Sequence, residues 1–406
     1  MIHLSFPTEV EMFTPAKPVL RYQLTFEGSW PMAVAFVGPR RLVAANQLGH
    51  IFLWELPEKS PEFKVDPKSD QKAPNVWPTR QLVGHTNEVT RLLVTPDGKQ
   101  LVSASLDHGV RVWPTDGKAT GTAGVILDED ARKREARRKG KKETTTEPSA
   151  TVETQTACEV LDGHKEWVYA LGMSGDGKRL ISGDAASQVI VWDLATRKPL
   201  TKWTGQSWNW IMAASLSPDG KKAFVSENRY KRDDFDVPTP GLKLWDVAIG
   251  KETLDIMKVQ FPKYNPSDRS YGGSQMWRKF VANGLICTAY SPDGKLLAAG
   301  QGGETDTGKV HLLDSETGKL VRDVASHQYG ITDLMFTADS KHVISVGRDT
   351  CVRVSQVSDG KEVAVLGSPR GGQFKDWLSA VALSPDEQWL AATDIAGIVH
   401  VWQFGG

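Results

Sequence analysis

The sequence predicts an all-β fold in which one small antiparallel sheet is repeated around a closed ring. Three observations support this: a residue spacing recurs along the chain, turn residues separate short apolar runs, and several runs end in tryptophan. Short runs with alternating apolar residues between turn residues are typical of antiparallel strands. One such sheet cannot bury both faces by itself, so each unit needs neighbours, and a closed ring leaves no exposed outer unit.

Two consecutive units show the repeat most clearly. In both, a His lies 18 residues before a Ser, and that Ser lies 10 residues before a Trp. The matching residues are His85, Ser103 and Trp113 in one unit and His164, Ser182 and Trp192 in the next. Within the first unit, Thr95-Pro96-Asp97-Gly98 suits a tight turn, because Pro presets φ at its position and Asp and Gly tolerate the remaining conformations.

The Gly-His opening, the Ser-Pro-Asp-Gly turn and the Trp-Asp end of these units resemble the WD40 repeat, whose family fold is a β-propeller of four-stranded blades. The unit-ending positions hold Trp54, Trp113, Trp192, Trp245 and Trp402, with Leu313 and Ser355 in the two departing units. The resemblance implies one seven-bladed propeller of four-stranded antiparallel blades over residues 1–406. The Ser-Pro-Asp-Gly-Lys wording is similar to bacterial members of the family, so we expect a bacterial-type sequence.

The last blade needs a strand from elsewhere in the chain. Trp402 is followed by four residues, which leaves no room for a fourth strand after it. Propellers of the resembled family usually close by lending an N-terminal strand to the last blade, and a strand edge needs a partner. We therefore expect residues 1–15 to supply the closing strand.

His85, Ser103 and Asp107 have the composition of a hydrolase triad, in which an imidazole lies between a hydroxyl and a carboxylate. The resemblance implies instead a structural hydrogen-bonded tetrad completed by Trp113. The set recurs as His327, Ser345 and Asp349, where Ser355 replaces the Trp and should weaken the network. His164 and Ser182, with Trp192, are expected to lack the acid, because Ala186 stands in its place. Repetition at identical spacing indicates a structural module.

A second repeated position is aromatic. Counting nine residues back from the Asp of a turn gives Trp167, Trp210 and Trp377, while Trp30 falls within one residue of that position and Glu88 occupies it in the second unit. The resemblance implies that this position lies at the top face, beside the central opening. Such indoles could anchor a peptide, or hold a cation near Glu88. Packing between blades is the alternative interpretation.

Four insertions interrupt the repeats. Residues 227–241 and 259–281 are expected on the top face, where the second brings Trp277 to the candidate partner-binding set, and the polar segments 57–76 and 116–154 are expected on the bottom face. Dense Lys and Arg at 132–142 could hold phosphates, although no aromatic residues interleave them. A solvated segment, disordered or forming a lone helix, and an acidic protein partner remain alternatives. The acidic stretch 232–236 could bind a cation or form a solvated loop.

Composition excludes several classes of function. Lys plus Arg and Asp plus Glu are equal at 49 each, so no bulk charge indicates a nucleic-acid or membrane partner. No apolar run approaches the roughly 20 residues needed to cross a bilayer, and the basic start of a signal peptide is missing, so we expect a cytoplasmic location. Cys158, Cys287 and Cys351 show no metal-binding or disulfide spacing. We expect no metal and no cofactor.

We therefore expect a non-enzymatic scaffold that binds a protein or peptide partner at its top face. One alternative is a hydrolase whose site lies in the central channel and uses residues of the insertions 227–241 and 259–281. Another is association with nucleic acid through residues 132–142. The identity of the partner and the oligomeric state stay open at this stage.

Overall fold

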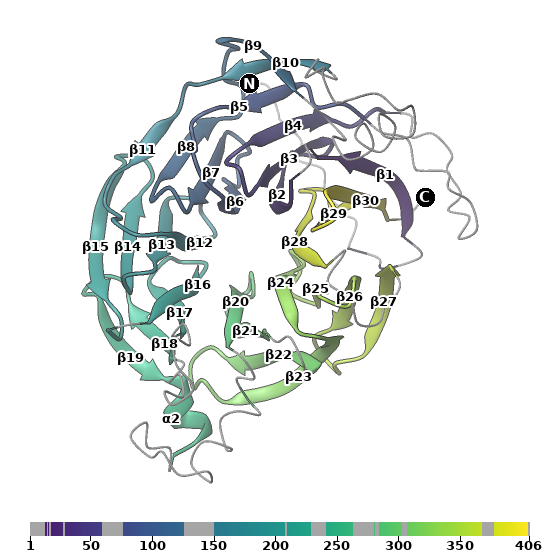
Figure 1. Ribbon diagram of the computed structural model, residues 1–406. Coiled ribbons are helices and arrows are strands. Elements are labelled where there is room, and N and C mark those ends of the chain that lie inside the picture. Colours follow the sequence, from purple (N-terminus) through teal and green to yellow (C-terminus); the bar gives the residue numbers. More distant parts are fainter. Residues whose placement is uncertain are drawn as a thin grey trace, which may run out of the picture.

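The computed structural model contains seven β-sheets arranged in a closed ring around a central axis (Figure 1). It describes residues 13, 15, 18–26, 29–58, 76–125, 150–207, 209–228, 241–262, 280, 284–302, 307–367 and 377–404. One strand of every sheet faces the centre of the ring, and the others follow outward. This arrangement confirms the predicted all-β, seven-bladed propeller of antiparallel sheets.

We number the sheets as blades 1 to 7 in chain order of their innermost strands. Blade 1 contains β2 (Pro31–Gly38), β3 (Arg41–Asn46), β4 (Ile51–Glu55) and β5 (Arg80–Leu82). Blade 2 contains β6 (Val89–Val94), β7 (Gln100–Ser105), β8 (Val110–Pro114) and β11 (Glu159–Leu161). Blade 3 contains β12 (Val168–Met173), β13 (Arg179–Asp184), β14 (Gln188–Asp193) and β15 (Lys198–Thr204).

The remaining blades repeat this pattern. Blade 4 contains β16 (Trp210–Leu216), β17 (Lys222–Asn228), β18 (Gly241–Asp246) and β19 (Lys251–Asp255). Blade 5 contains β20 (Leu285–Tyr290), β21 (Leu296–Gln301), β22 (Thr307–Asp314) and β23 (Leu320–Gln328). Blade 6 contains β24 (Ile331–Phe336), β25 (His342–Gly347), β26 (Cys351–Gln356) and β27 (Glu362–Gly367). Blade 7 contains β28 (Leu378–Leu383), β29 (Trp389–Asp394), β30 (Ile398–Gln403) and β1 (Val19–Thr25).

A short helix, α2 (Ile256–Gln260), follows blade 4. The side chain of Asp255 caps it by accepting a hydrogen bond from the Lys258 amide, and Ile256 and Met257 are buried. Throughout the described part of the chain, no helix is suited to spanning a membrane.

The N-terminal strand closes the ring as expected, but not at the expected residues. β1 pairs antiparallel with β30, from Val19 opposite Gln403 to Thr25 opposite Ile398. Tyr22 and Leu24 are fully buried, and the ring of Tyr22 stacks on Trp389 with centroids 6.1 Å apart. The prediction of residues 1–15 was wrong in position, because pairing with β30 places the closing strand at Val19–Thr25. Residues 1–12 lie outside the described part of the chain.

The insertion at 116–154 also differs from its prediction. Its two ends form β9 (Gly121–Val125) and β10 (Ala150–Gln155), and β10 pairs in parallel with β5, which extends the sheet of blade 1 to six strands. Val125 and Val152 are buried against the core of blade 1. β5 has only three residues, and its outer edge offers unpaired backbone groups that a further strand can satisfy. The basic segment 132–142 lies outside the described residues.

The hydrophobic core lies between neighbouring blades. One cluster, for example, joins Ile181 and Val189 of blade 3 to Ile211 and Val225 of blade 4, all fully buried. The blades are also tied by side-chain hydrogen bonds to the next blade: Thr90 Oγ1 donates to the carbonyl of Val168 at 2.7 Å. Across the closing seam, Ser379 Oγ donates to the carbonyl of Pro31 at 2.6 Å.

All seven innermost strands share one irregularity. The register shifts after the first residue that pairs with the second strand in six blades, and after the second such residue, Ile211, in blade 4; this is typical of a β-bulge with one extra residue. The residues directly after this shift, which we call the channel layer, are Ala33, Arg91, Ala170, Ala213, Cys287, Asp333 and Ala380. Because the shift recurs in every blade, these seven residues lie at one level of the central channel.

Candidate functional site: the top entrance of the central channel

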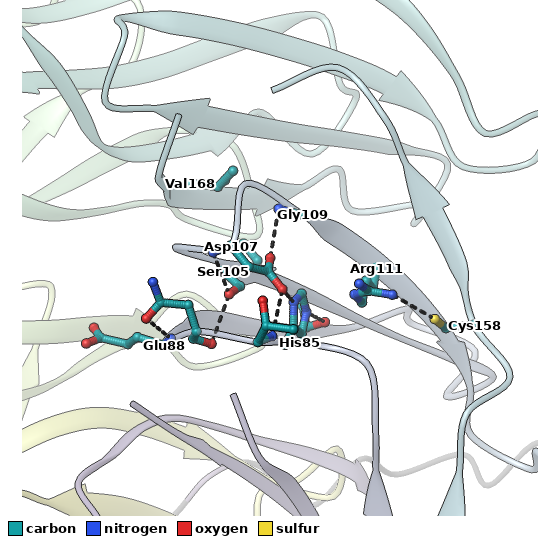
Figure 2. A network of polar contacts seen from close by, with 12 residues as sticks. His85, Glu88, Ser105, Asp107, Gly109, Arg111, Cys158 and Val168 are labelled. Atoms are coloured by element: carbon teal, nitrogen blue, oxygen red, sulfur yellow. Dashed lines mark hydrogen bonds and ion pairs between the residues drawn. The ribbon is translucent and has the colours of Figure 1, made fainter. Parts of the chain in front are cut away.

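The triad-like sets are buried inside their blades. In blade 2, Nδ1 of His85 lies 2.8 Å from Oδ2 of Asp107, and Nε2 lies 2.7 Å from Oγ of Ser103. Figure 2 shows His85 and Asp107 in this network, with the amide of Gly109 donating to the same carboxylate. Trp113 Nε1 donates to Ser103 Oγ at 2.9 Å, and Ser103 is fully buried. The hydroxyl therefore holds strands together and is not open to a substrate.

The acid of this set is tuned by its surroundings. Burial by itself raises the pKa of Asp107. The hydrogen bond and charge of His85, together with hydrogen bonds from the backbone amides of Thr86 and Gly109, outweigh burial, so the pKa of Asp107 lies well below its usual value. A carboxylate that stays ionised keeps accepting these hydrogen bonds.

The set in blade 3 is complete, contrary to prediction. Nδ1 of His164 lies 2.7 Å from Oδ2 of Asp184, and Nε2 lies 2.6 Å from Oγ of Ser182, which accepts a hydrogen bond from Trp192. Ala186 does occupy the acid's usual position, but the side chain of Asp184, two residues earlier at the end of β13, reaches the same imidazole. Sequence spacing missed it because two backbone positions can point a carboxylate at one His.

Blade 6 has the acid but lacks the Trp. His327 contacts Asp349 at 2.8 Å and Ser345 at 2.9 Å, while the buried Ser355 Oγ finds no hydrogen-bond partner among the described residues. Arg353 lies in an ion pair with Asp349 at 3.1 Å and with Glu362 at 2.6 Å. The network therefore gains a cation where the Trp is missing.

The five described residues of the candidate partner-binding set occupy equivalent positions, just before or at the start of an innermost strand. In six blades the carbonyl at this position accepts a hydrogen bond from the amide that follows the second strand. The pairs are Trp30 with Gln47, Glu88 with Leu106, Trp167 with Ala185, Gly284 with Gly302, Gly330 with Arg348, and Trp377 with Ile395. In blade 4, Trp210 lies opposite Asn228. We call this end of the channel the top entrance.

A cavity of about 480 Å³ opens at the top entrance. Trp30, Glu88 and Trp377 line it, together with Arg348, whose guanidinium lies 4.5 Å from the centroid of the Trp377 ring. Trp30 is 50% exposed, an unusual state for so large an apolar side chain. Burial raises the pKa of Glu88 above its usual value.

Trp167 and Trp210 do not line this cavity and instead form an aromatic stack beside it. Their rings meet edge to face with centroids 6.1 Å apart, and Trp210 stacks on Tyr169 at 5.3 Å. Tyr169 does line the cavity. The packing interpretation therefore holds for Trp210, whereas Trp167 remains 40% exposed. Trp277, which belonged to the same predicted set, lies outside the described residues.

Most residues of the cavity wall were not predicted from the sequence. In every blade the residue two positions after the candidate position also lines the cavity: Met32, Thr90, Tyr169, Met212, Ile286, Thr332 and Ser379. Side chains two apart on a strand share a face, so counting two further from each Trp would have found them. No sequence spacing indicated Arg348, because it follows the second strand of blade 6 and does not belong to an innermost strand.

A second cavity of about 520 Å³ lies deeper in the channel. Its lining is mainly aliphatic, and among the described residues the charged members are Arg91 and Asp333. Within that part of the chain, no three His, Cys, Asp or Glu side chains are grouped closely enough to hold a metal ion. The lining gives no support to the hydrolase alternative. The acidic segment 232–236 lies outside the described residues.

Comparison with known proteins bears on these features. Residues 77–114, 155–193, 318–354 and 363–403 match the family model of the WD domain, G-beta repeat. The chain is 25% identical over 238 residues to autophagy-related protein 16 of Arabidopsis thaliana, covering 58% of this chain and 39% of that protein. It is 24% identical over 245 residues to WD repeat and SOCS box-containing protein 1 of Homo sapiens, covering 59% and 49%.

A third relative matches over more of its own length. The guanine nucleotide-binding protein subunit beta of Solanum tuberosum is 24% identical over 345 residues, which cover 67% of this chain and 88% of that protein. The chain thus spans less than two thirds of the first two relatives. All three relatives are eukaryotic, so the expectation of a bacterial-type sequence is not borne out.

Fold and tetrads together define a seven-bladed β-propeller whose blades are held by repeated His, Ser and acid networks. More particularly, four segments of this ring match the WD domain, G-beta repeat, over residues 77–114, 155–193, 318–354 and 363–403. The comparisons indicate no enzyme family.

Proposed function

We propose that the protein is a non-enzymatic interaction scaffold that holds a peptide segment of a partner protein at the top entrance of the channel. The cavity there, lined by Trp30, Glu88 and Trp377, is the observation that carries the proposal. A concave site with apolar walls and few polar groups suits a ligand that inserts side chains. The Solanum tuberosum relative is named as a protein subunit, which is consistent with a propeller that works through protein partners.

The exposed aromatic residues have the right chemistry for an anchor. An indole buries a large apolar area and still offers an N–H donor, and interface energy concentrates in such residues. Trp30 and Trp167 are 50% and 40% exposed at the rim of one opening. Covering them with a partner would remove this apolar area from water, at about 25 cal/mol for each Å² covered.

Affinity capture with matched variants tests the proposal. The wild type, a Trp30→Ala/Trp377→Ala variant and a Trp77→Ala control are used as bait in lysate of the native cell, after their thermal melting has been compared. Trp77 is 48% exposed but precedes β5, away from the top entrance, so it controls for the loss of an exposed indole. We expect a partner that the wild type and the control retain and the double variant loses. Identical captures by all three would contradict the proposal.

A further inference from the structure

The channel layer is uniform except at two places. Five of its residues are small: Ala33, Ala170, Ala213, Cys287 and Ala380. The other two are Arg91 of blade 2 and Asp333 of blade 6. Arg91 and Asp333 both line the deeper cavity, and among the described residues they are its charged members.

Arg91 lies where the two cavities meet, because it lines both the upper and the deeper one. Its Nη1 makes one long hydrogen bond, 3.5 Å, to the carbonyl of Thr90. Among the described residues, no carboxylate lies within ion-pair distance of its guanidinium. A partly buried guanidinium with no carboxylate at ion-pair distance attracts an anion that enters the channel, so this position favours an anionic ligand.

Asp333 does not take the role of that anion. Its Oδ2 accepts a hydrogen bond from the amide of Val381 in blade 7 at 3.1 Å, which ties it to the wall of the channel. Burial raises the pKa of Asp333, and this outweighs the lowering by the charge of Arg91. Asp333 is therefore bonded to a backbone amide of the neighbouring blade, and among the described residues no ion pair joins it to Arg91.

We propose that the channel binds the free C-terminal carboxylate of a partner peptide, with Arg91 as the residue that receives it; this rests on the proposed function of the top entrance. The planar guanidinium matches a carboxylate with two parallel N–H bonds. Capture of a terminal carboxylate is an established mode of peptide recognition.

Depth in the channel selects a chain end over an internal segment. Arg91 follows Glu88 by three residues, one of them the extra residue of the bulge, which places its backbone about 7 Å below the rim at the rise of a β-strand. An internal segment would have to pass down and back through the same opening, whereas a chain end passes once. Met32, Met212 and Ile286 line the upper cavity above Arg91, so the last side chain of the ligand is apolar.

A peptide library tests this without knowledge of the natural partner. Random decapeptides with free C-terminal carboxylates are selected on the full-length wild-type protein, and the selected sequences are made again as free acids and as C-terminal amides. Binding is measured by fluorescence anisotropy to the wild type, Arg91→Gln, Arg91→Lys and a matched control, Arg21→Gln. Arg21 lies on β1, the outer strand of blade 7, and donates to Gln403 of β30, remote from the channel.

We expect amidation to weaken binding to the wild type at least tenfold. Arg91→Gln should weaken the free acid to the level of the amide and leave the amide unchanged, which a general loss of folding would not do. Arg91→Lys should recover part of the preference for the free acid over the amide, because Lys restores the positive charge without the two parallel N–H donors of a guanidinium. Arg21→Gln should bind as the wild type does.

Three results would overturn the inference: no peptide is selected, acids and amides bind equally, or Arg91→Gln weakens both forms equally. If acids and amides bind equally but Trp30→Ala/Trp377→Ala abolishes binding, the top entrance is still the interaction site and only the carboxylate inference fails. If the lysate capture fails while acid-selective peptides bind through Arg91, the proposed scaffold function fails and the carboxylate inference stands.

Discussion

The Nδ1 atom of His164 lies 2.7 Å from Oδ2 of Asp184, and Oδ1 of the same carboxylate accepts the amides of Ala186 and Gln188 at 2.9 Å each. One side chain therefore fixes both the imidazole and the turn between β13 and β14. Asp394 does the same in blade 7, where Oδ1 accepts two turn amides and Oδ2 lies 2.6 Å from His400. At this position one carboxylate both contacts the imidazole and caps the turn.

Replacing Asp184 by Ala should lower the free energy of unfolding by about 2–4 kcal/mol, because a buried imidazole and two amides lose their partner. The double variant Asp184→Ala/Ala186→Asp places the acid where blade 2 has Asp107 and should recover part of that loss. Urea denaturation followed by tryptophan fluorescence measures both. Asp184→Ala with unchanged stability would contradict this role.

Ser355→Ala should raise the free energy of unfolding by about 1 kcal/mol, since it removes a buried hydroxyl that has no hydrogen-bond partner in the described structure. The matched change Ser345→Ala removes a hydroxyl that lies 2.9 Å from Nε2 of His327, and it should lower stability by about 1–3 kcal/mol. Opposite signs in chemical denaturation are the expected result. Destabilisation by both changes would show that Ser355 has an essential partner.

Stability should fall in mild acid through His327. Burial lowers the pKa of His327 below its ordinary value of 6.5, which outweighs the effect of Asp349. The folded state therefore resists a proton that the unfolded chain accepts: its contribution is complete above about pH 6.5 and is lost as pH falls towards the lower folded pKa.

Thermal melting of wild type and His327→Gln from pH 8 to pH 5 measures this. The variant should be less stable overall but should lose less stability over that range. His108→Gln, at an exposed turn residue, should retain the wild-type slope. Parallel slopes for wild type and His327→Gln would exclude His327 as the source.

The closing strand should carry much of the stability of blade 7. Leu24→Ala removes a fully buried side chain from β1 and should cost about 2–5 kcal/mol. Val19→Ala, at a residue of the same strand that is 39% exposed, should change stability by less than about 0.5 kcal/mol. The two changes are compared by urea denaturation, and equal effects would mean that β1 does not seal the core.

Sequence spacing predicted the candidate positions at the top entrance well where the repeat is regular. Glu88, Trp167 and Trp377 lie nine residues before a turn Asp, and they share one backbone hydrogen-bond pattern with Trp30. Spacing could not separate Trp30 and Trp377, which line the cavity, from Trp210, which stacks on Tyr169. That distinction depends on the direction of each indole and on its contacts with the neighbouring blade.

The errors share a physical cause. Asp184 was missed because the spacing rule admits one position for the acid, while the structure allows two. β9 and β10 were missed because their segment is largely polar, and its pairing with the edge of β5 is a contact between residues far apart in the sequence. The closing strand was placed too early because pairing with β30, rather than local apolar content, sets its position.

The sequence by itself determined the repeated sheet, the number of blades and the His and Ser of each tetrad, because these depend on local spacing and turn chemistry that recur from unit to unit. Only the tertiary structure decided which Trp side chains face the cavity, how Arg348 reaches it, and that Arg91 lines both cavities. Those relations join residues from different blades, and closure of the ring, not the spacing within one blade, brings them together.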